Sequence, residues 1–126
     1  MQLPLKQIYH YHIYHDCGKP YCLEIDDEGR RHFPDHANIS YKVAQNFLND
    51  EVCTLIKNDM VAHLTKPSEF ESFMELDNFK TLLITALCEI HSNAVMFGGI
   101  DSQSFKIKHK KLNRLGKNVV KNLEGK

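Results

Sequence analysis

Long apolar runs are missing from this 126-residue sequence. No stretch approaches the ~20 apolar residues that a membrane-spanning helix needs. The segment before Asp16 carries three histidines and has no apolar centre of the kind found in secretory signal peptides. These absences predict a soluble, cytoplasmic protein that has no membrane partner.

Cysteine is scarce, and its spacing is irregular: the sequence has Cys17, Cys22, Cys53 and Cys88. Only the first two lie close together, and no second close pair completes a zinc knuckle. Four cysteines would also permit two disulfides. Because no secretory signal precedes them, we expect reduced and partly buried thiols, with structural zinc as the lesser alternative.

The sequence also lacks a net charge, because 16 basic residues balance 16 acidic ones. The two signs are unevenly distributed. Residues 1–105 hold 8 basic and 15 acidic side chains, whereas residues 106–126 hold 8 basic side chains and one acid, Glu124. We therefore expect a helical domain over residues 1–105 and a basic C-terminal extension over residues 106–126. Such an extension could contact a nucleic acid, fold back on the acidic body or remain a solvated helix.

Hydrophobic periodicity indicates helices along most of the chain. The expected helices cover residues 3–16, 35–48, 51–64, 68–76, 79–97 and 112–123. The acidic residues before Gly29 favour a turn, which predicts a short hairpin or flap between residues 21–23 and 31–33. The expected fold is a compact all-α bundle with this hairpin between its first two helices.

The segment His15–Pro20, with the sequence HDCGKP, ends the first expected helix. Neighbouring imidazole and carboxylate groups at a helix end can both turn toward one metal ion. Gly18 would let the backbone leave the helix. Lys19 would then place an ammonium group beside the site, where it could hold a phosphate oxygen. The segment therefore predicts a metal centre that acts on phosphate groups.

This segment and the residues after it resemble the HD-domain superfamily of metal-dependent phosphohydrolases, in particular the HD domains of tRNA nucleotidyltransferases and related nucleotide phosphohydrolases. In those proteins an HD-x-GKP segment precedes an acidic turn with glycine, and a phenylalanine-x-x-histidine follows. This chain has the turn at Asp26–Gly29 and then Phe33-Pro34-Asp35-His36. The resemblance covers about residues 5–100 and is strongest over residues 13–40.

The resemblance implies a helical bundle that hydrolyses a phosphomonoester or phosphodiester in a nucleotide or nucleic acid. It also implies one or two divalent ions, which could be Mn, Mg, Fe, Ni or Zn. The residues that match the metal ligands are His15, Asp16, His36, Asp59 and Asn93. By the same resemblance, Asp16 and Lys19 carry out catalysis, while Lys19 and His63 bind the substrate.

Three positions depart from the family pattern. The family's first histidine, on a helix upstream of the HD pair, has no counterpart in this sequence. Asp59 stands where the family often has a histidine, and His63, one turn later, is the other candidate for that role. Asn93 replaces the last aspartate of the family, and its neutral amide would bind a divalent ion more weakly than a carboxylate would.

These departures support a second hypothesis, in which the chain is a degenerate HD-like module without catalytic activity. Such a module would bind nucleic acid or a partner protein through its basic C-terminal end. The intact HDCGKP segment and His36 argue against degeneration. Without an upstream helix, part of the apolar segment 82–97 would lack a cover, which points to a homo-oligomer.

Overall fold

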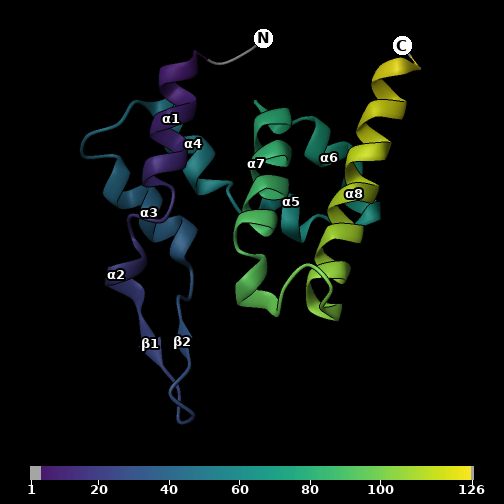
Figure 1. Ribbon diagram of the computed structural model, residues 1–126. Helices are drawn as coiled ribbons and strands as arrows, with labels where there is room; N and C mark the ends of the chain where they lie inside the picture. Colours follow the sequence, from purple (N-terminus) through teal and green to yellow (C-terminus); the bar gives the residue numbers. More distant parts are fainter. Residues whose placement is uncertain (1–3, 126) are drawn as a thin grey trace. The chain divides into compact units, whose positions relative to one another are not determined.

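The computed structural model describes residues 4–125 and is helical along most of that length, which confirms the all-α expectation. Figure 1 shows the helices α1 to α8 and a single hairpin, β1–β2. The chain forms two compact units, Met1–Asp59 and Met60–Lys126. The charge pattern had placed the boundary after residue 105. The structure instead runs helix α8 (Gln103–Glu124) continuously through that point.

Over residues 4–59, the part of the first unit that the structure describes, the chain forms four helices and the hairpin. In chain order these are α1 (Leu5–Tyr14), α2 (Lys19–Cys22), β1 (Glu24–Ile25), β2 (Arg31–His32), α3 (His36–Ala44) and α4 (Asp50–Lys57). Helices α1 and α3 both pack on α4, and α2 packs on α3. The contact side of α4 is apolar because Val52, Leu55 and Ile56 recur at helical spacing, and all three are buried.

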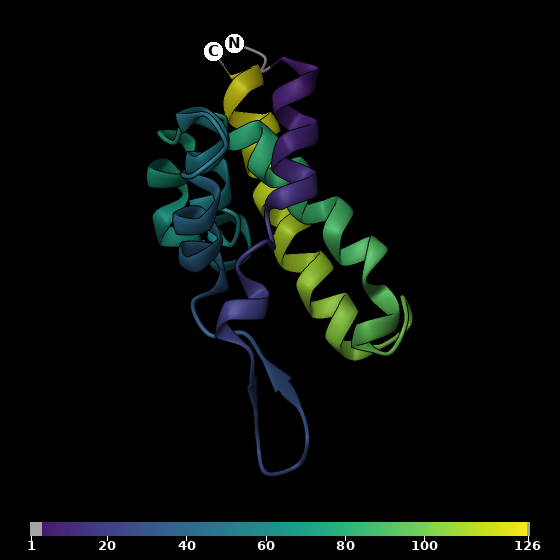
Figure 2. The same cartoon turned by 90° about the vertical axis from the view of Figure 1, so that its left-hand side faces the viewer.

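A hairpin is present as the sequence predicted, and β2 falls within the expected segment 31–33. The other expected segment, 21–23, is not a strand, because its first two residues belong to α2 and β1 begins only at Glu24. The turn of the hairpin is held by Asp26, whose carboxylate accepts hydrogen bonds from the backbone N–H groups of Glu28 and Arg30. Gly29 has a φ of 79°, a left-handed conformation that favours glycine. In both Figure 1 and Figure 2 the hairpin extends away from the helices of its unit.

The second unit is built from helices packed around α7. It contains α5 (Val61–Leu64), α6 (Phe70–Met74), α7 (Phe79–Ser92) and α8, with 3₁₀ turns η1 (Pro67–Glu69) and η2 (Ala94–Phe97). Helix α7 packs on α8, and α5 packs on both. The shared core is formed by apolar side chains that include Ala62, Phe73, Leu83, Ala86, Ile90, Phe105, Leu112, Leu115 and Val119.

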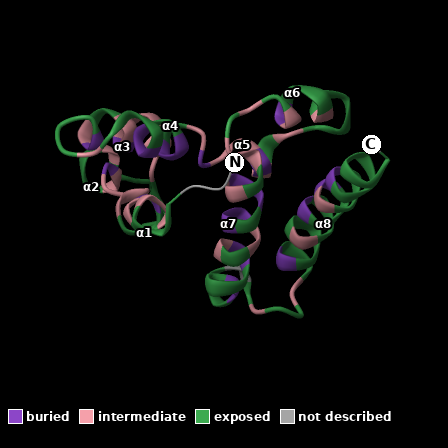
Figure 3. Cartoon of the chain, turned by 90° about the horizontal axis from the view of Figure 1, so that it is seen from above, coloured by how far each residue is buried: buried purple, intermediate pink, exposed green. Residues whose placement is uncertain are grey.

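Residues 106–124 are part of helix α8, whose apolar side chains belong to this core, and so they are not an extension of it. Leu112, Leu115 and Val119 of α8 are buried, while the cationic side chains point outward. Figure 3 shows buried positions recurring among exposed ones along α8. An amphipathic helix therefore accounts for residues that composition alone assigned to a separate segment.

Two of the expected helices are interrupted. The helix expected over residues 51–64 ends at Lys57, and α5 begins only at Val61. One continuous helix would have placed Asp59 and His63 on the same face. Because of the break, the two residues do not share a helical face. The helix expected over residues 79–97 ends at Ser92, and the chain continues as η2 up to Gly98, whose φ is 95°.

The cysteines are free thiols. Cys17 and Cys22 are half-buried and Cys53 is buried, as expected, whereas Cys88 is exposed. Burial raises the pKa of the Cys17 and Cys53 thiols, which disfavours the reactive thiolate. Among the described residues, no helix combines the length and the apolar character that crossing a bilayer requires.

Candidate metal centre

Three side chains of the first unit converge where α1 and α4 end. His15 follows the last residue of α1, Asp16 lies in the next turn, and Asp59 lies just after α4. Each offers one possible ligand atom, and these atoms all lie within 4.8 Å of one another. One imidazole and two carboxylates within this range form a suitable ligand set for a divalent ion.

The ring of His15 is held in the orientation that a metal ligand needs. Its Nδ1 lies 2.8 Å from the backbone carbonyl oxygen of His12. A carbonyl oxygen only accepts hydrogen bonds, so Nδ1 carries a proton and donates it. The other nitrogen, Nε2, faces Asp16 at 3.2 Å from Oδ2. In the neutral ring Nε2 therefore holds the lone pair, and a backbone contact of this kind is typical of metal-binding histidines.

Asp59 is the buried member of the cluster, with only 3% of its surface exposed. An ionised carboxylate is costly to bury unless hydrogen bonds or opposite charges compensate it. The phenol of Tyr11 donates such a hydrogen bond to Oδ1 at 2.6 Å, and Tyr11 is itself fully buried. Sequence reasoning missed Tyr11, although it precedes His15 by four residues and so lies on the same face of α1.

The cluster favours a cation at the position of His15. Burial alone would lower the pKa of His15, but the hydrogen bond and charge of Asp16, the charge of Asp59 and the bond to His12 together raise it to about 9. Burial would likewise raise the pKa of Asp16, but the hydrogen bond and charge of His15, with the charge of Lys19, lower it to about 2. The two carboxylates thus attract positive charge.

Lys19 and His36 lie beside Asp16, as the motif predicted. The Lys19 ammonium is 3.2 Å from Asp16 Oδ2 and lies 5.1 Å above the centre of the Phe33 ring. His36 opens α3, its Nδ1 donates to the backbone oxygen of Phe33 at 3.3 Å, and its Nε2 is 3.9 Å from Asp16 Oδ1. His36 thus approaches Asp16 without belonging to the tight group of His15, Asp16 and Asp59.

Gly18 serves this arrangement for a different reason than the sequence suggested. Its φ is −86°, an ordinary helical value, so its conformational freedom is not used. Its N–H donates to Ser40 Oγ at 2.8 Å, and an added Cβ would lie 2.7 Å from the carbonyl carbon of Ile39 and collide with the backbone nitrogen of Ser40. Glycine is therefore needed because the turn approaches α3 so closely.

His63 and Asn93 lie in the second unit. His63 Nε2 is 3.6 Å from Glu89 Oε2, and both side chains are mostly buried. Asn93 is exposed and follows the last residue of α7, where its backbone N–H donates to the backbone carbonyl oxygen of Glu89 at 2.9 Å. Asn93 is therefore not a core residue of the second unit. The roles of both residues at the metal centre stay predictions.

The candidate centre is thus defined by His15, Asp16 and Asp59, with Lys19 and His36 beside it. All of these residues except Asp59 come from the part of the sequence in which the HD-like motif is strongest. No protein-family model, curated protein or solved structure matches the chain.

Proposed function

We propose that the chain is an HD-type metal-dependent phosphohydrolase that acts on a nucleotide or nucleic-acid phosphoester. The observation that carries this proposal is the convergence of His15, Asp16 and Asp59, with His15 already oriented by its backbone contact. These three residues would hold a divalent ion such as Mn²⁺, Fe²⁺, Ni²⁺, Zn²⁺ or Mg²⁺. When bound, the ion would act as a Lewis acid toward a phosphoryl oxygen and lower the pKa of water.

The remaining polar groups are suited to holding the phosphate. The Lys19 ammonium is more than a third exposed and could turn from Asp16 toward a phosphate oxygen. His36 presents Nε2 toward the same carboxylate, since its Nδ1 is occupied by Phe33. It could contact the substrate phosphate or a second ion. The hairpin, which follows directly on α2, would cover the bound substrate.

The proposal predicts hydrolysis of simple phosphoesters that depends on Lys19. Full-length protein with saturating Mn²⁺ should hydrolyse bis(p-nitrophenyl) phosphate, p-nitrophenyl phosphate or both. Lys19→Gln should lower kcat about 100- to 1,000-fold, the range expected when one preorganised group that stabilises developing charge is lost. Release of p-nitrophenol gives the rate directly, and comparison of the two esters separates phosphodiesterase from phosphomonoesterase activity.

Lys57→Gln is the matched control for this experiment. Lys57 lies 5.0 Å above the Tyr41 ring, much as Lys19 lies above Phe33, but among the described residues it makes no ion pair with a carboxylate. Its substitution should leave hydrolysis unchanged. The proposal fails if neither ester is hydrolysed faster than in a metal-only blank, or if the two variants lose activity equally.

The second candidate function is binding of nucleic acid through α8. Its exposed side has a stripe of cations at helical spacing, formed by Lys106, Lys110, Arg114, Lys117 and Lys121. The stripe extends over about 22 Å, at ~1.5 Å per residue. Within the described part of the chain, none of the five forms an ion pair with an acid. A row of unneutralised cations of this kind favours a polyanion.

This second candidate is best tested by reversing charges, because truncation after Phe105 would remove the buried residues of α8. The double variant Lys106→Glu/Lys110→Glu should bind a generic oligonucleotide more weakly. The slope of log K against log salt should become shallower by about two, since each lost phosphate contact removes about one released counterion. Fluorescence anisotropy at several salt concentrations measures both effects.

The control is the same change of charge in the first unit, Lys42→Glu/Lys57→Glu. Both of its positions lie outside α8. Equal losses in the two double variants would mean that only net charge matters. If the parent protein shows no salt-dependent binding at low ionic strength, the cationic side of α8 is only solvated and binds no nucleic acid.

A further inference from the structure

An apolar groove runs between α7 and α8 in the second unit. Its α7 wall is formed by Leu83, Ile84 and Leu87, which lie on one side of that helix, and Val120 and Leu123 of α8 face them. The groove encloses about 610 Å³, within the range of ligand sites in proteins. Ile84 is 61% exposed, Val120 52% and Leu123 41%. Three large apolar side chains thus meet solvent in one concave surface.

Gly116 lies in this groove and is not explained by the packing of α8. Glycine inside a helix costs about 1 kcal/mol relative to alanine. Gly116 does not have a positive φ, and an added Cβ would lie 3.9 Å from Leu83 Cδ2, an ordinary contact. The close fit that makes Gly18 necessary is therefore absent here. A glycine that α8 does not need for its own packing leaves room for another molecule to approach the helix backbone.

The border of the groove is basic. Lys80 lies on the α7 side and Lys117 and Lys121 lie on the α8 side, while Glu124 is the only acid among the residues that line the groove. A second copy of the chain placed symmetrically on this surface would bring lysines against lysines. None of the described residues that line the groove is aromatic, so they offer no surface on which a nucleic-acid base could stack.

We propose that this groove binds an amphipathic helix with acidic flanks from a partner protein. Apolar residues of that helix, spaced i, i+3, i+4 and i+7, would fill the space between Ile84 and Val120 and pass over Gly116. Its acidic residues would pair with the lysines on both sides. The groove follows α8 over residues 113–124, about 18 Å at ~1.5 Å per residue, which matches a helix of three to four turns.

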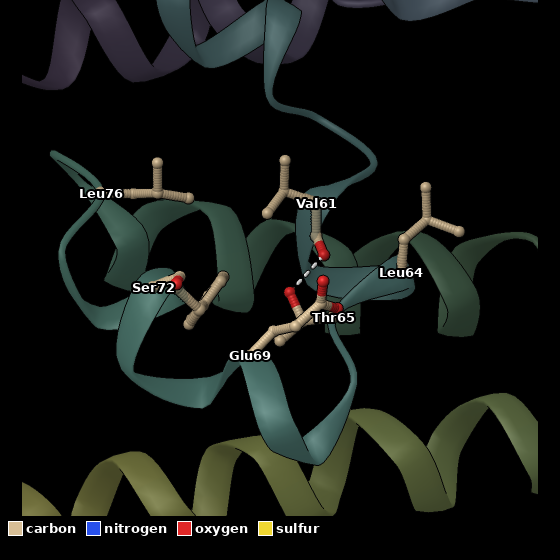
Figure 4. A pocket seen from close by; sticks show the side chains of 7 residues that line it. Val61, Leu64, Thr65, Glu69, Ser72 and Leu76 are labelled. Atoms are coloured by element: carbon tan, nitrogen blue, oxygen red, sulfur yellow. Dashed lines mark hydrogen bonds between the residues drawn. The ribbon is translucent and has the colours of Figure 1, made fainter.

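Another hollow in the same unit lacks these features. It lies between α5 and α6, has a volume of about 320 Å³ and is drawn in Figure 4. Two of its polar side chains already have local partners, since Thr65 Oγ1 donates to the Val61 backbone oxygen and Glu69 Oε1 accepts from the Lys66 N–H. No lysine lines it. The basic border therefore distinguishes the groove between α7 and α8.

The test uses the full chain and labelled 18-residue helical peptides. One peptide carries leucines at i, i+3, i+4 and i+7 with glutamates on both flanks, and two matched peptides carry glutamines or lysines in place of those glutamates. Fluorescence anisotropy should show that the glutamate peptide binds at least tenfold more tightly than the lysine peptide. Ile84→Glu should weaken its binding at least tenfold. Gly116→Leu, which fills the floor of the groove, should do the same.

Two controls separate docking from folding. Ile107→Glu changes an apolar residue of α8 that is 60% exposed and lies outside the groove, so it should leave binding unchanged. Gly116→Ala should melt at the same temperature as the parent or higher, because alanine favours the helix, and yet should bind the peptide more weakly.

Four results would overturn the proposal. In the first, the glutamate and lysine peptides bind equally tightly, or neither binds. In the second, Ile84→Glu binds the glutamate peptide as tightly as Ile107→Glu does. In the third, Ile84→Glu weakens binding of an oligonucleotide and leaves peptide binding intact, so that the groove is part of a nucleic-acid site. In the fourth, sedimentation shows a parent dimer that Ile84→Glu dissociates, so that a second copy is the occupant.

Discussion

Replacing Gly18 with alanine is expected to destabilise the first unit by about 3 kcal/mol or more, at the upper end of the cost of overpacking. The added methyl group would press on the backbone of Ile39 and Ser40, which cannot rotate away as a flexible side chain can. Relief would require α3 to move away from the turn. Such a movement would break the hydrogen bond from the Gly18 N–H to Ser40 Oγ and displace His36, which opens α3.

Urea unfolding followed by tyrosine fluorescence measures this effect selectively. All five tyrosines of the chain lie before residue 59 and the chain has no tryptophan, so the signal reports on the first unit. Gly116→Ala is the matched control, because a Cβ at Gly116 has room, and its unfolding is followed by far-ultraviolet circular dichroism because Gly116 lies in the second unit. A Gly18→Ala variant with an unchanged midpoint would show that α3 and the turn adjust to each other without cost.

Gly18 illustrates what the sequence could and could not predict. The HDCGKP pattern identified Gly18 as important, but the reason given was the exit of the chain from a helix. The actual reason is the proximity of α3, more than twenty residues later, and a local pattern does not report such a distance. Tyr11 was missed for a similar cause. Its apolar ring fits the helical periodicity, and its hydrogen bond to Asp59 depends on how α1 packs on α4.

The helices themselves were largely predictable, because apolar residues recur at helical spacing along the chain. The residues at which the helices end were harder to predict. The break between Lys57 and Val61 interrupts a segment whose apolar pattern continues, and it places Asp59 in a turn. For residues 106–126, the expectation of a separate extension rested on their positive charge. It gave too little weight to Leu112, Leu115 and Val119, whose spacing indicates a buried helical face. Net charge reports on solubility and partners, whereas burial depends on the apolar spacing.

Removing a ligand of the candidate metal centre is expected to reduce divalent-metal affinity at least 100-fold. In the parent, Mn²⁺, Ni²⁺ or Zn²⁺ at 100 times its Kd should stabilise the first unit by about 2.7 kcal/mol, because the ion binds only the folded state. His15→Ala and Asp59→Asn should abolish this gain. Asp59→Asn is the more informative change, since its amide oxygen can still accept the Tyr11 hydrogen bond while the charge is lost.

Asp27→Asn provides the control, because it makes the same chemical change at an exposed residue of the hairpin turn. Tyrosine-detected melting at increasing metal concentration gives the affinity, and elemental analysis of the purified protein gives the metal bound. A parent whose melting temperature does not respond to any of these ions would exclude the centre. Equal responses in Asp59→Asn and the parent would exclude Asp59 as a ligand.

The affinity should also depend on pH, because the proton and the metal compete for His15 Nε2. Burial lowers the pKa of His15, but Asp16 and the other partners raise it to about 9. The metal must therefore displace a proton from His15 at neutral pH. Asp16, with its pKa lowered to about 2, stays ionised in this range. Each pH unit below 9 should therefore weaken the apparent affinity of the metal about tenfold, giving a loss of about 100-fold between pH 8 and pH 6.

Calorimetric titration in buffers of different ionisation enthalpy should detect about one proton released per ion bound at pH 7. An affinity that does not change between pH 6 and pH 8, with no proton released, would mean that the ion does not bind to Nε2 of His15.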